Sequence, residues 1–255
     1  MTSSSERIAL ITGGSRGLGR NMAIKLAEQG VGVVITYHSC AADAEQVVAE
    51  ISARGQKALA LRLDVGASAT FETFAEHLRA ELIRVFGRAQ LDYLVNNAGV
   101  GLSASFAETS EAQFDALMNI HLKGTFFLSQ RLLPLIADGG RILNVSTGLA
   151  RFSFPGYAAY ATMKGGVEVL TRYMAKELAS RRIAVNVLAP GAIETDFRGG
   201  EVRDNPQINA HIAAQTALGR VGLPDDIGQA VAMLLSPAFG WLNGQRIELS
   251  GGMML

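Results

Sequence analysis

Apolar residues gather in short runs along the chain, and stretches with a helical spacing of apolar positions separate these runs. Residues 7–12, Arg-Ile-Ala-Leu-Ile-Thr, show no alternation with polar residues, as expected of a strand buried on both faces. In the next stretch Leu18, Met22 and Leu26 follow one another at intervals of four residues, and Gly30 suits the position just after a helix. The pattern therefore predicts a strand followed by a helix.

The same alternation continues to the end of the chain. It predicts seven strands, over residues 7–12, 31–36, 57–63, 91–95, 141–145, 183–188 and 246–249. It predicts helices over residues 18–29, 41–54, 68–86, 110–136 and 157–179, and another that begins at Pro224. Strands that alternate with helices form a parallel sheet covered on both faces. We therefore expect one α/β domain over residues 1–255, a Rossmann-type doubly wound fold around a seven-stranded parallel sheet.

Composition narrows the classes of function. About half of the residues are apolar (49%), and the 23 basic and 23 acidic residues balance without a basic stripe, which argues against nucleic acid as a partner. No apolar stretch is long enough to cross a bilayer, and the polar residues 1–6 do not resemble a secretory signal, so we expect a cytoplasmic protein without a membrane partner. The single cysteine, Cys40, excludes an internal disulfide, and the four histidines lack metal-ligand spacing, so we expect no metal.

A glycine-rich segment, Thr-Gly-Gly-Ser-Arg-Gly-Leu-Gly over residues 12–19, connects the first predicted strand to the first predicted helix. Glycines allow a tight turn and a close approach of the backbone to a phosphate, and the helix N-terminus beyond them offers free N–H groups. Ligands of such sheets bind beyond the carboxyl ends of the strands, where this segment lies. The alternative is a turn without a ligand, but the position between strand and helix favours nucleotide binding.

Tyr160 and Lys164 are separated by one helical turn in the predicted helix over residues 157–179. Residues at this spacing share a helix face, and an ammonium there favours the phenolate form of a neighbouring phenol. The pair can therefore serve as a proton donor to a carbonyl. The alternative is an ordinary amphipathic helix that carries a tyrosine and a lysine.

Four motifs occur in the order and spacing of one family. Residues 12–19, Asn-Asn-Ala-Gly at 96–99, Tyr160 with Lys164, and Pro-Gly at 190–191 together resemble the classical short-chain dehydrogenases/reductases, in particular their 3-oxoacyl-carrier-protein-reductase-like subgroup. The resemblance extends over nearly the whole chain. It implies hydride transfer between a nicotinamide and a carbonyl or secondary alcohol, with Tyr160 as proton donor and Lys164 on the ribose hydroxyls.

The resemblance also implies which residues bind the cofactor. The expected contacts, besides Tyr160 and Lys164, come from Gly13, Ser15, Arg16, Gly17, Leu18, Gly19, His38, Ser39, Asp64, Val65, Asn97, Ala98, Gly99, Pro190, Gly191, Ile193 and Thr195. Within this set Asp64 matches the residue that binds the adenine amino group. Ile193 matches the residue that packs on the nicotinamide ring, and Thr195 the one that binds its carboxamide.

The end of the second predicted strand bears on the choice of nicotinamide. NAD enzymes usually place an acid there, whereas this strand continues as Tyr-His-Ser at 37–39 and the first acid is Asp43. Arg16 lies inside the glycine segment, where NADP-preferring relatives carry a basic residue. We therefore predict NADP(H) over NAD(H), with Ser15, Arg16, His38 and Ser39 around the 2′-phosphate. The alternative for Arg16 is a solvated charge.

Two positions depart from the family pattern. The family's carbonyl-binding serine lies thirteen residues before the tyrosine, and counting back from Tyr160 reaches Thr147, with Ser146 as the neighbouring alternative. Threonine keeps the hydroxyl, although its extra methyl stiffens the side chain. The family's catalytic asparagine falls on His121. Two interpretations stay open for His121, a member of a proton relay or a wall residue without a role in catalysis.

Aromatic residues follow the predicted catalytic segments. Phe152 and Phe154 precede Tyr160, and Phe197 lies in the segment 194–215, which we expect to form a substrate lid with a flexible Arg-Gly-Gly at 198–200. These residues suit an apolar or aromatic carbonyl substrate. Three arginines, Arg151, Arg198 and Arg203, leave open an anionic or carrier-bound substrate.

We therefore predict an NADP(H)-dependent oxidoreductase that acts on a small carbonyl or alcohol. The alternatives are a 3-oxoacyl-carrier-protein reductase proper, a non-catalytic NADP-binding regulator, and an epimerase or dehydratase on the same scaffold. The family resemblance also implies a homo-oligomer, a tetramer or a dimer, which packs through the helices after the fourth and fifth strands. The apolar patterns over residues 114–136 and 167–178 permit this packing.

Overall fold

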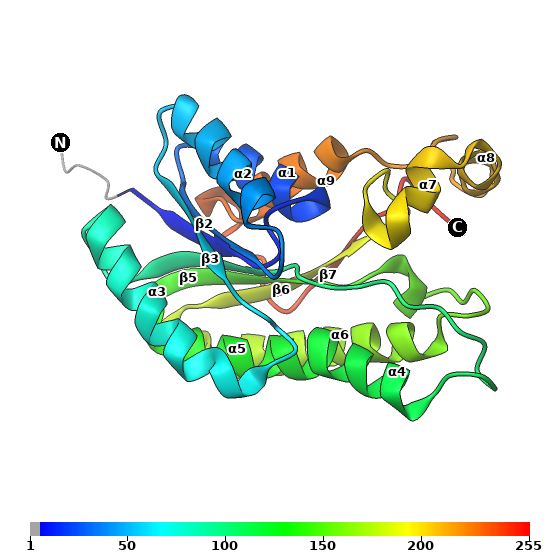
Figure 1. The fold of residues 1–255 in the computed structure, drawn as a ribbon, viewed down its shortest axis with the longest axis horizontal. Coiled ribbons are helices and arrows are strands. Elements are labelled where there is room, and N and C mark those ends of the chain that lie inside the picture. The colour runs from blue at the N-terminus through cyan, green and yellow to red at the C-terminus, as the bar shows by residue number, and fades with distance from the viewer. Residues whose placement is uncertain (1–5) are drawn as a thin grey trace.

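The protein folds around one seven-stranded sheet in which all strands run parallel, as the computed structural model of residues 6–255 shows (Figure 1). Residues 1–5, the polar start of the chain, lie outside the described part. The strands are β1 (Ile8–Ile11), β2 (Gly32–Tyr37), β3 (Ala58–Arg62), β4 (Leu91–Asn96), β5 (Ile136–Val145), β6 (Ala184–Pro190) and β7 (Arg246–Leu249). Their spatial order is β3-β2-β1-β4-β5-β6-β7, so the chain reverses its direction across the sheet between β1 and β4. Such a switch point opens a crevice for a ligand at the carboxyl ends of the strands.

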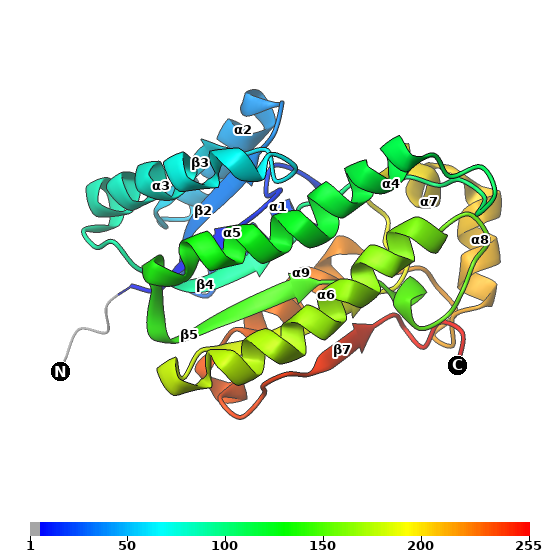
Figure 2. The same cartoon turned by 90° about the horizontal axis from the view of Figure 1, so that it is seen from below.

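Helices cover both faces of the sheet and confirm the doubly wound fold. One face carries α1 (Gly17–Glu28), α2 (Ala41–Ala53) and α9 (Pro224–Leu234). The other face carries α3 (Phe71–Phe86), α4 (Glu111–Leu117), α5 (Gly124–Leu132) and α6 (Ala158–Glu177), as the view from below shows (Figure 2). Two short helices, α7 (Glu201–Asp204) and α8 (Pro206–Ala214), lie beyond the carboxyl ends of the strands.

The two layers of helices explain the apolar runs in the sequence. In β1, Ala9 and Ile11 pack in the core on the side of α1 and α9, whereas Ile8 and Leu10 pack in the core on the side of α3 and α5. All four side chains are completely buried. Since both faces of the sheet are covered, a central strand has no polar side, and its sequence shows no alternation.

The region between β4 and β5 differs from the predicted continuous helix over residues 110–136. Helix α4 ends at Leu117, a π-helical segment spans Met118–Lys123, α5 follows, and a short 3₁₀ turn with Pro134 ends the helical region. Strand β5 begins at Ile136, five residues before the prediction, and its pairing with β4 contains a bulge. The prediction started the strand too late because the Asp-Gly-Gly sequence at 138–140 is typical of a loop. In the structure these residues belong to β5, and Gly139 has a φ of 79°, which glycine adopts without strain.

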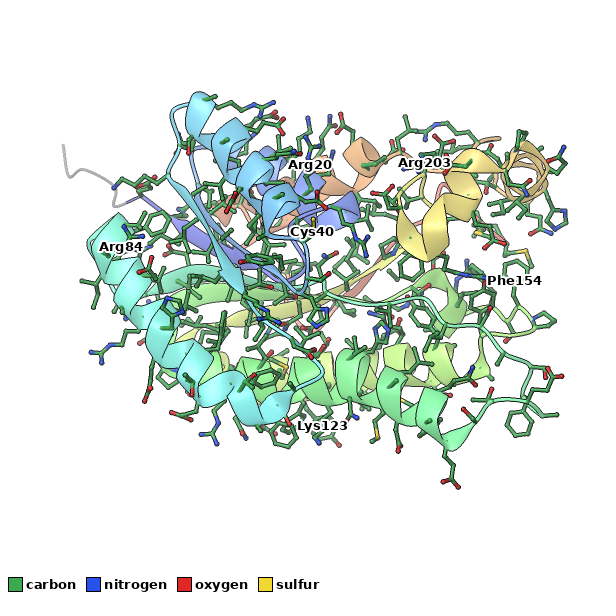
Figure 3. The ribbon with its side chains drawn as sticks, viewed as in Figure 1. Arg20, Cys40, Arg84, Lys123, Phe154 and Arg203 are labelled. Atoms are coloured by element: carbon green, nitrogen blue, oxygen red, sulfur yellow. The ribbon has the colours of Figure 1, made fainter. Side chains whose placement is uncertain are left out.

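The loops and short helices gather at the carboxyl ends of the strands. Figure 3 shows Arg203 on α7 and Phe154 in the loop before α6 at this end of the molecule.

None of the helices formed by residues 6–255 is both long and apolar enough to traverse a lipid bilayer.

Candidate active site

One cavity of about 840 Å³ lies at the carboxyl ends of the strands. Its walls come from the glycine segment, from the loops that follow β2 to β6, and from the segment around α7 and α8. Every residue that the sequence indicated for cofactor binding or catalysis lines this cavity, including Tyr160, Thr147 and His121. The fold therefore brings together residues that lie up to 182 positions apart, from Gly13 to Thr195.

The glycine segment forms a tight turn at one end of the cavity. Gly13 has a φ of 66°, a Cβ on Gly14 would lie 2.5 Å from the Ile35 side chain, and a Cβ on Gly19 would lie 2.2 Å from the Gly13 carbonyl oxygen. A side chain at Gly14 or Gly19 would thus collide with neighbouring protein atoms, so the tight packing of this turn requires glycine. At the start of α1 no side chain caps the first turn, since the N-cap residue Arg16 makes no capping bond. These backbone N–H groups face the cavity, where an anion would complete their hydrogen bonds.

Thr12 fastens the loop after β4 to the glycine segment, a role that the sequence did not indicate. Its hydroxyl oxygen accepts hydrogen bonds from the backbone N–H of Asn97 (3.0 Å) and Ala98 (2.9 Å). The Asn97 side chain in turn donates to the Thr12 carbonyl oxygen (2.9 Å). The amide of Asn97 is therefore engaged with protein backbone, and its contribution to the cavity is to hold two loops in register.

Basic and acidic groups meet at the end of the cavity beyond β2 and β3, where the sequence predicted the adenosine of the cofactor. His38 and Arg16 are exposed there, and the His38 ring lies 3.6 Å from the Asp64 carboxylate. Arg62, the last residue of β3, donates to the His38 carbonyl oxygen (3.3 Å) and adds a basic group that the sequence analysis missed. The sequence does mark Arg62, because it is the one charged residue in the apolar run of β3. Asp43 in the first turn of α2 also lines the cavity.

Helix α6 places Tyr160 and Lys164 on its buried face. The two side chains are 8% and 5% exposed, and the Lys164 Nζ atom lies 5.9 Å from the centre of the Tyr160 ring. The ammonium donates to the Val145 carbonyl oxygen (2.7 Å), while burial lowers the pKa of Lys164 to about 8. Burial also raises the pKa of Tyr160, and a side-chain hydrogen bond with Thr147 opposes this rise. The phenol is thus neutral at pH 7 and carries the proton that a donor needs.

The hydroxyls of Ser146 and Thr147 point to different partners. Ser146 is buried, and its Oγ atom donates to the Glu168 carboxylate (2.7 Å). Thr147 is half-buried, and its side chain shares the hydrogen bond with Tyr160 and accepts from the Leu149 N–H (3.3 Å). Of the two candidates, Thr147 therefore has its hydroxyl beside the phenol.

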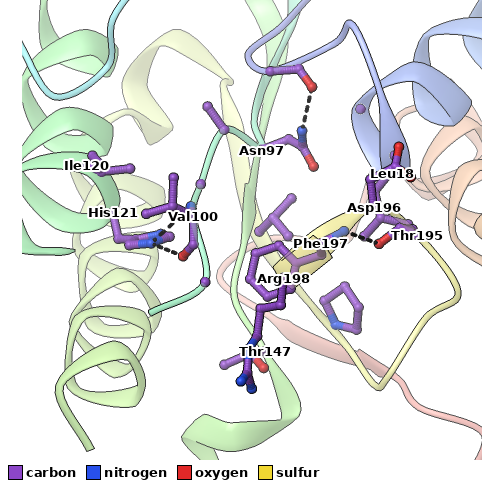
Figure 4. A pocket seen from close by; sticks show the side chains of 18 of the residues that line it. Leu18, Asn97, Val100, Ile120, His121, Thr147, Thr195, Asp196, Phe197 and Arg198 are labelled. Carbon is purple, nitrogen blue, oxygen red and sulfur yellow. Dashed lines mark hydrogen bonds between the residues drawn. The ribbon is translucent and has the colours of Figure 1, made fainter. Parts of the chain in front are cut away.

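His121 lies in the π-helical segment and contacts Tyr160 edge to face, with 5.1 Å between ring centres. Its Nε2 atom lies 2.9 Å from the Val100 carbonyl oxygen (Figure 4). Burial, together with the Lys164 charge, lowers the pKa of His121 to about 3, so the ring is neutral. The Val100 N–H also lies 3.4 Å from this Nε2 atom, but the shorter contact to the carbonyl oxygen favours the tautomer that donates from Nε2 and carries a lone pair on Nδ1. Among residues 6–255 this buried Nδ1 atom has no hydrogen-bond partner.

Aromatic side chains form the wall of the cavity near Tyr160. Phe152 and Phe154 pack edge to face with 5.6 Å between their centres, and Phe197 lies 6.3 Å from Tyr160. The Arg198 guanidinium stacks 5.0 Å above the Tyr157 ring. All of these side chains line the cavity, so aromatic rings make up much of its surface beside the phenol.

The three arginines that left open an anionic substrate are already paired. Arg151 donates to Glu248 and to the Met253 and Met254 carbonyl oxygens, outside the cavity. Arg203 forms ion pairs with Asp196 and Asp204. Only Arg198 of the three lines the cavity, and Glu201 lies 3.3 Å from it. Their charges are therefore largely compensated inside the protein.

Within residues 6–255 there is no group of three or more histidine, cysteine, aspartate or glutamate side chains that could hold a metal ion. Cys40 is an exposed free thiol at the start of α2.

Comparison with known proteins identifies the family. Residues 13–254 match the sequence model of a family described as enoyl-(acyl carrier protein) reductase. The chain belongs to the classical short-chain dehydrogenases/reductases. It is therefore an oxidoreductase of the type that interconverts carbonyls and alcohols with a nicotinamide cofactor.

Relatives of this short-chain dehydrogenase/reductase include named reductases. A hydroxynaphthalene reductase-like protein, Arp2 of Metarhizium brunneum, is 36% identical over 96% of this chain and 94% of its own length. The promiscuous reductase LugOII, which catalyses keto-reduction at C1 during lugdunomycin biosynthesis, is 36% identical with a TM-score of 0.93, over 99% of this chain and 100% of LugOII. The landomycin C-6 ketoreductase LanV, solved with NADP and rabelomycin, is 34% identical with a TM-score of 0.88, over 97% and 96% of the two chains.

Proposed function

We propose that this enzyme is an NADPH-dependent ketoreductase in which Tyr160 protonates the carbonyl oxygen of an aromatic, ring-fused ketone. The observation that carries the proposal is the meeting of a neutral buried phenol, the Thr147 hydroxyl and the Lys164 ammonium in one cavity that begins at an open helix N-terminus.

The proposed chemistry divides between the cofactor and the protein. NADPH supplies the hydride when it is bound. The Thr147 hydroxyl donates a hydrogen bond to the carbonyl oxygen and orients it, and the Tyr160 hydroxyl transfers its proton to that oxygen as the alkoxide forms. Lys164 binds the ribose hydroxyls, and its positive charge stabilises the phenolate that remains. Leu149 and Phe197 help to exclude water from this end of the cavity.

The preference for NADP(H) rests on the groups at the adenosine end. Arg16, His38 and Arg62 bring basic side chains to the end of β2, where NAD enzymes place a carboxylate. LanV, one of the relatives, contains NADP. Titration of the protein with NADPH and with NADH tests this point, and tighter binding of NADH would contradict it.

The proposed substrate class follows from the aromatic wall and from the relatives. The cavity presents Phe152, Phe154, Tyr157 and Phe197 beside the phenol, a surface that suits a flat ring system. One relative is named a hydroxynaphthalene reductase-like protein, and another, LanV, was solved with rabelomycin. The arginines that a carrier-bound acyl chain would need are paired with acids, which weakens the alternative of a 3-oxoacyl-carrier-protein reductase. A non-catalytic regulator is also disfavoured, since Tyr160 and Lys164 are both in place.

Two features of the whole enzyme belong to the same proposal. Residues 194–215, which include α7 and α8, act as a lid over the substrate side of the cavity. The chain forms a homo-oligomer through α5 and α6, where Phe126, Phe127, Val169 and Tyr173 are between 40% and 65% exposed. Large apolar side chains at this density on neighbouring helices favour a protein partner over water.

A substrate panel tests the proposal. The enzyme with NADPH would be offered 1-tetralone and 2-tetralone, an open-chain ketone, and an acetoacetyl thioester that imitates a carrier-bound chain. Loss of nicotinamide absorbance with the bicyclic ketones at the highest kcat/KM is the expected result. Preference for the thioester would support the carrier-protein alternative, and absence of turnover with every compound despite NADPH binding would support a regulator.

A further inference from the structure

The end of β5 is joined to α6 by a series of polar contacts. On α6 the residues that take part share one face at helical spacing, namely Tyr160, Lys164, Glu168 and Thr171. They meet four consecutive residues at the end of β5 and just after it, namely Asn144, Val145, Ser146 and Thr147. Two of these contacts, those of Lys164 and Tyr160, belong to the proposed reaction. The contact between Ser146 and Glu168 has no part in it.

Glu168 also forms an ion pair with Arg246. Its Oε1 atom accepts both the Ser146 hydroxyl (2.7 Å) and the Arg246 Nε–H (2.8 Å). Arg246 begins β7, and its other nitrogens donate to Glu248 (2.7 Å) and to the carbonyl oxygen of Thr147 (3.4 Å). The side chains of Glu168, Arg246 and Glu248 are 14%, 25% and 19% exposed. Solvent therefore screens these charges less than those of a surface pair.

We propose that Glu168 and Arg246 are positioning residues that fix the Thr147 hydroxyl against Tyr160 for carbonyl reduction. They hold the strand end at two points, the side chain of Ser146 and the backbone carbonyl of Thr147. This role rests on the proposed ketoreductase function, because it concerns the hydroxyl that orients the substrate.

The chemistry of threonine explains why the backbone needs this support. A β-branched side chain has few χ1 rotamers, so the direction of the Thr147 hydroxyl depends on where the backbone places its Cα–Cβ bond. Thr147 lies beyond the last ladder residue of β5, Val145. The Ser146 N–H still donates to the Leu188 carbonyl oxygen (2.7 Å) and the Ala150 N–H to the Thr147 carbonyl oxygen (3.3 Å), but a fixed hydroxyl direction needs further restraint from neighbouring elements. The charged pair supplies that restraint from α6 and β7. A shift of about 1 Å at a reacting group is enough to lower a rate by roughly 100-fold.

Glu168→Gln is the main test variant. It keeps the shape and the hydrogen-bond acceptor but removes the charge that holds Arg246. We expect kcat to fall about 10- to 100-fold with an unchanged Kd for NADPH, and the primary isotope effect with 4-deuterated NADPH to rise because hydride transfer becomes slower. Glu72→Gln is the matched control. It breaks an exposed pair with Arg131 (2.9 Å) on the helices α3 and α5, and should leave all of these values unchanged.

A double variant separates positioning from mere stability. Glu168→Gln leaves Arg246 partly unpaired and should lower the melting temperature. Adding Arg246→Gln removes this charge, so the melting temperature should recover while kcat stays low. Recovery of kcat together with stability would show a structural role only and overturn the proposal. Ser146→Ala keeps both charges and should lower kcat by a smaller factor than Glu168→Gln. This variant replaces the charge variants as the test if they do not fold.

A structural measurement that does not depend on catalysis tests the positioning role separately from the proposed function. In crystals of the NADPH complexes, the Thr147 Oγ1 atom should move by about 0.5 Å or more from Tyr160 in Glu168→Gln and stay in place in Glu72→Gln. If the wild-type enzyme reduces no ketone, the proposed function fails, and this displacement still decides the positioning role. An unmoved hydroxyl, or a wild-type kcat and isotope effect in Glu168→Gln, would overturn it.

Discussion

At the scale of single residues, burial sets the properties of the three groups around the proposed reaction centre. It keeps the Tyr160 phenol protonated, lowers the pKa of Lys164 to about 8 and lowers that of His121 to about 3. A protonated phenol, an easily deprotonated ammonium and a neutral imidazole thus lie within one buried cluster. Each of these protonation states can be tested by a separate measurement.

The neutral state of His121 predicts a flat response to pH. Because its pKa is far below the ordinary value, His121 should contribute no inflection to kcat between about pH 5 and 8. His121→Asn, which restores the residue usual in the family, should therefore keep the pH profile of the wild type. An inflection in this range that disappears in His121→Asn would show that the imidazole changes charge during turnover, and would favour the relay interpretation.

Lys164 gives a second prediction, on stability. Its pKa is about 8 in the folded protein and about 10.4 in an unfolded chain, so the unfolded state binds more protons between these values. Unfolding free energy should therefore rise with pH from about 8 to 10 in the ligand-free protein. In Lys164→Met this rise should be absent and the melting temperature at pH 7 should be higher, while activity is lost. Lys123→Met, at an exposed position, is the control. An unchanged stability profile in Lys164→Met would contradict the burial argument.

At the scale of elements, one residue of the proposed lid, Arg198, contacts two segments outside the lid and one residue within it. Arg198 stacks on Tyr157, donates to the Ser103 hydroxyl (3.2 Å) and pairs with Glu201. Its backbone has a φ of 54°, which is uncommon outside glycine. The Arg198 side chain also packs against the backbone of Gly101. A Cβ at Gly101 would lie 2.4 Å from this side chain, so the contact requires glycine.

Arg198→Ala should therefore loosen the lid. We expect faster proteolysis within residues 194–215 and a higher KM for the ketone, with an unchanged Kd for NADPH. Arg84→Ala, an exposed residue on α3, is the matched control. Equal proteolysis and KM in the variant and the wild type would show that these contacts do not hold the segment.

Elements also show what the sequence could and could not predict. Buried strands such as β1 follow from uninterrupted apolar runs, and helices such as α6 follow from helical spacing. The glycine segment and the Tyr160–Lys164 pair follow from local motifs. The π-helical segment around His121 and the early start of β5 did not, because a break in helical hydrogen bonding has no apolar period of its own. The partners of Thr12, Ser146 and Arg246 were also hidden, since each depends on residues distant in the chain.

At the scale of the whole molecule, the apolar surface of α5 and α6 predicts assembly. Replacing Phe127 and Tyr173, which are 40% and 65% exposed, by glutamate should convert the proposed homo-oligomer to smaller species. Sedimentation velocity gives the mass directly. Glutamate at Ile83, which is 50% exposed on α3, is the control and should leave the mass unchanged. A wild-type protein that sediments as a monomer at micromolar concentration would contradict the proposed assembly.

The central claim is that Tyr160 donates the proton in an NADPH-dependent ketone reduction. Its most direct test is single-turnover oxidation of NADPH by a bicyclic aromatic ketone, followed by nicotinamide absorbance, in the wild type and in Tyr160→Phe. The variant keeps the ring that contacts His121 and Phe197 but lacks the hydroxyl. We predict rapid oxidation in the wild type, and in the variant a rate lower by about 100-fold or more with unchanged NADPH binding. Equal rates in the two proteins would place the proton donor elsewhere and contradict this account.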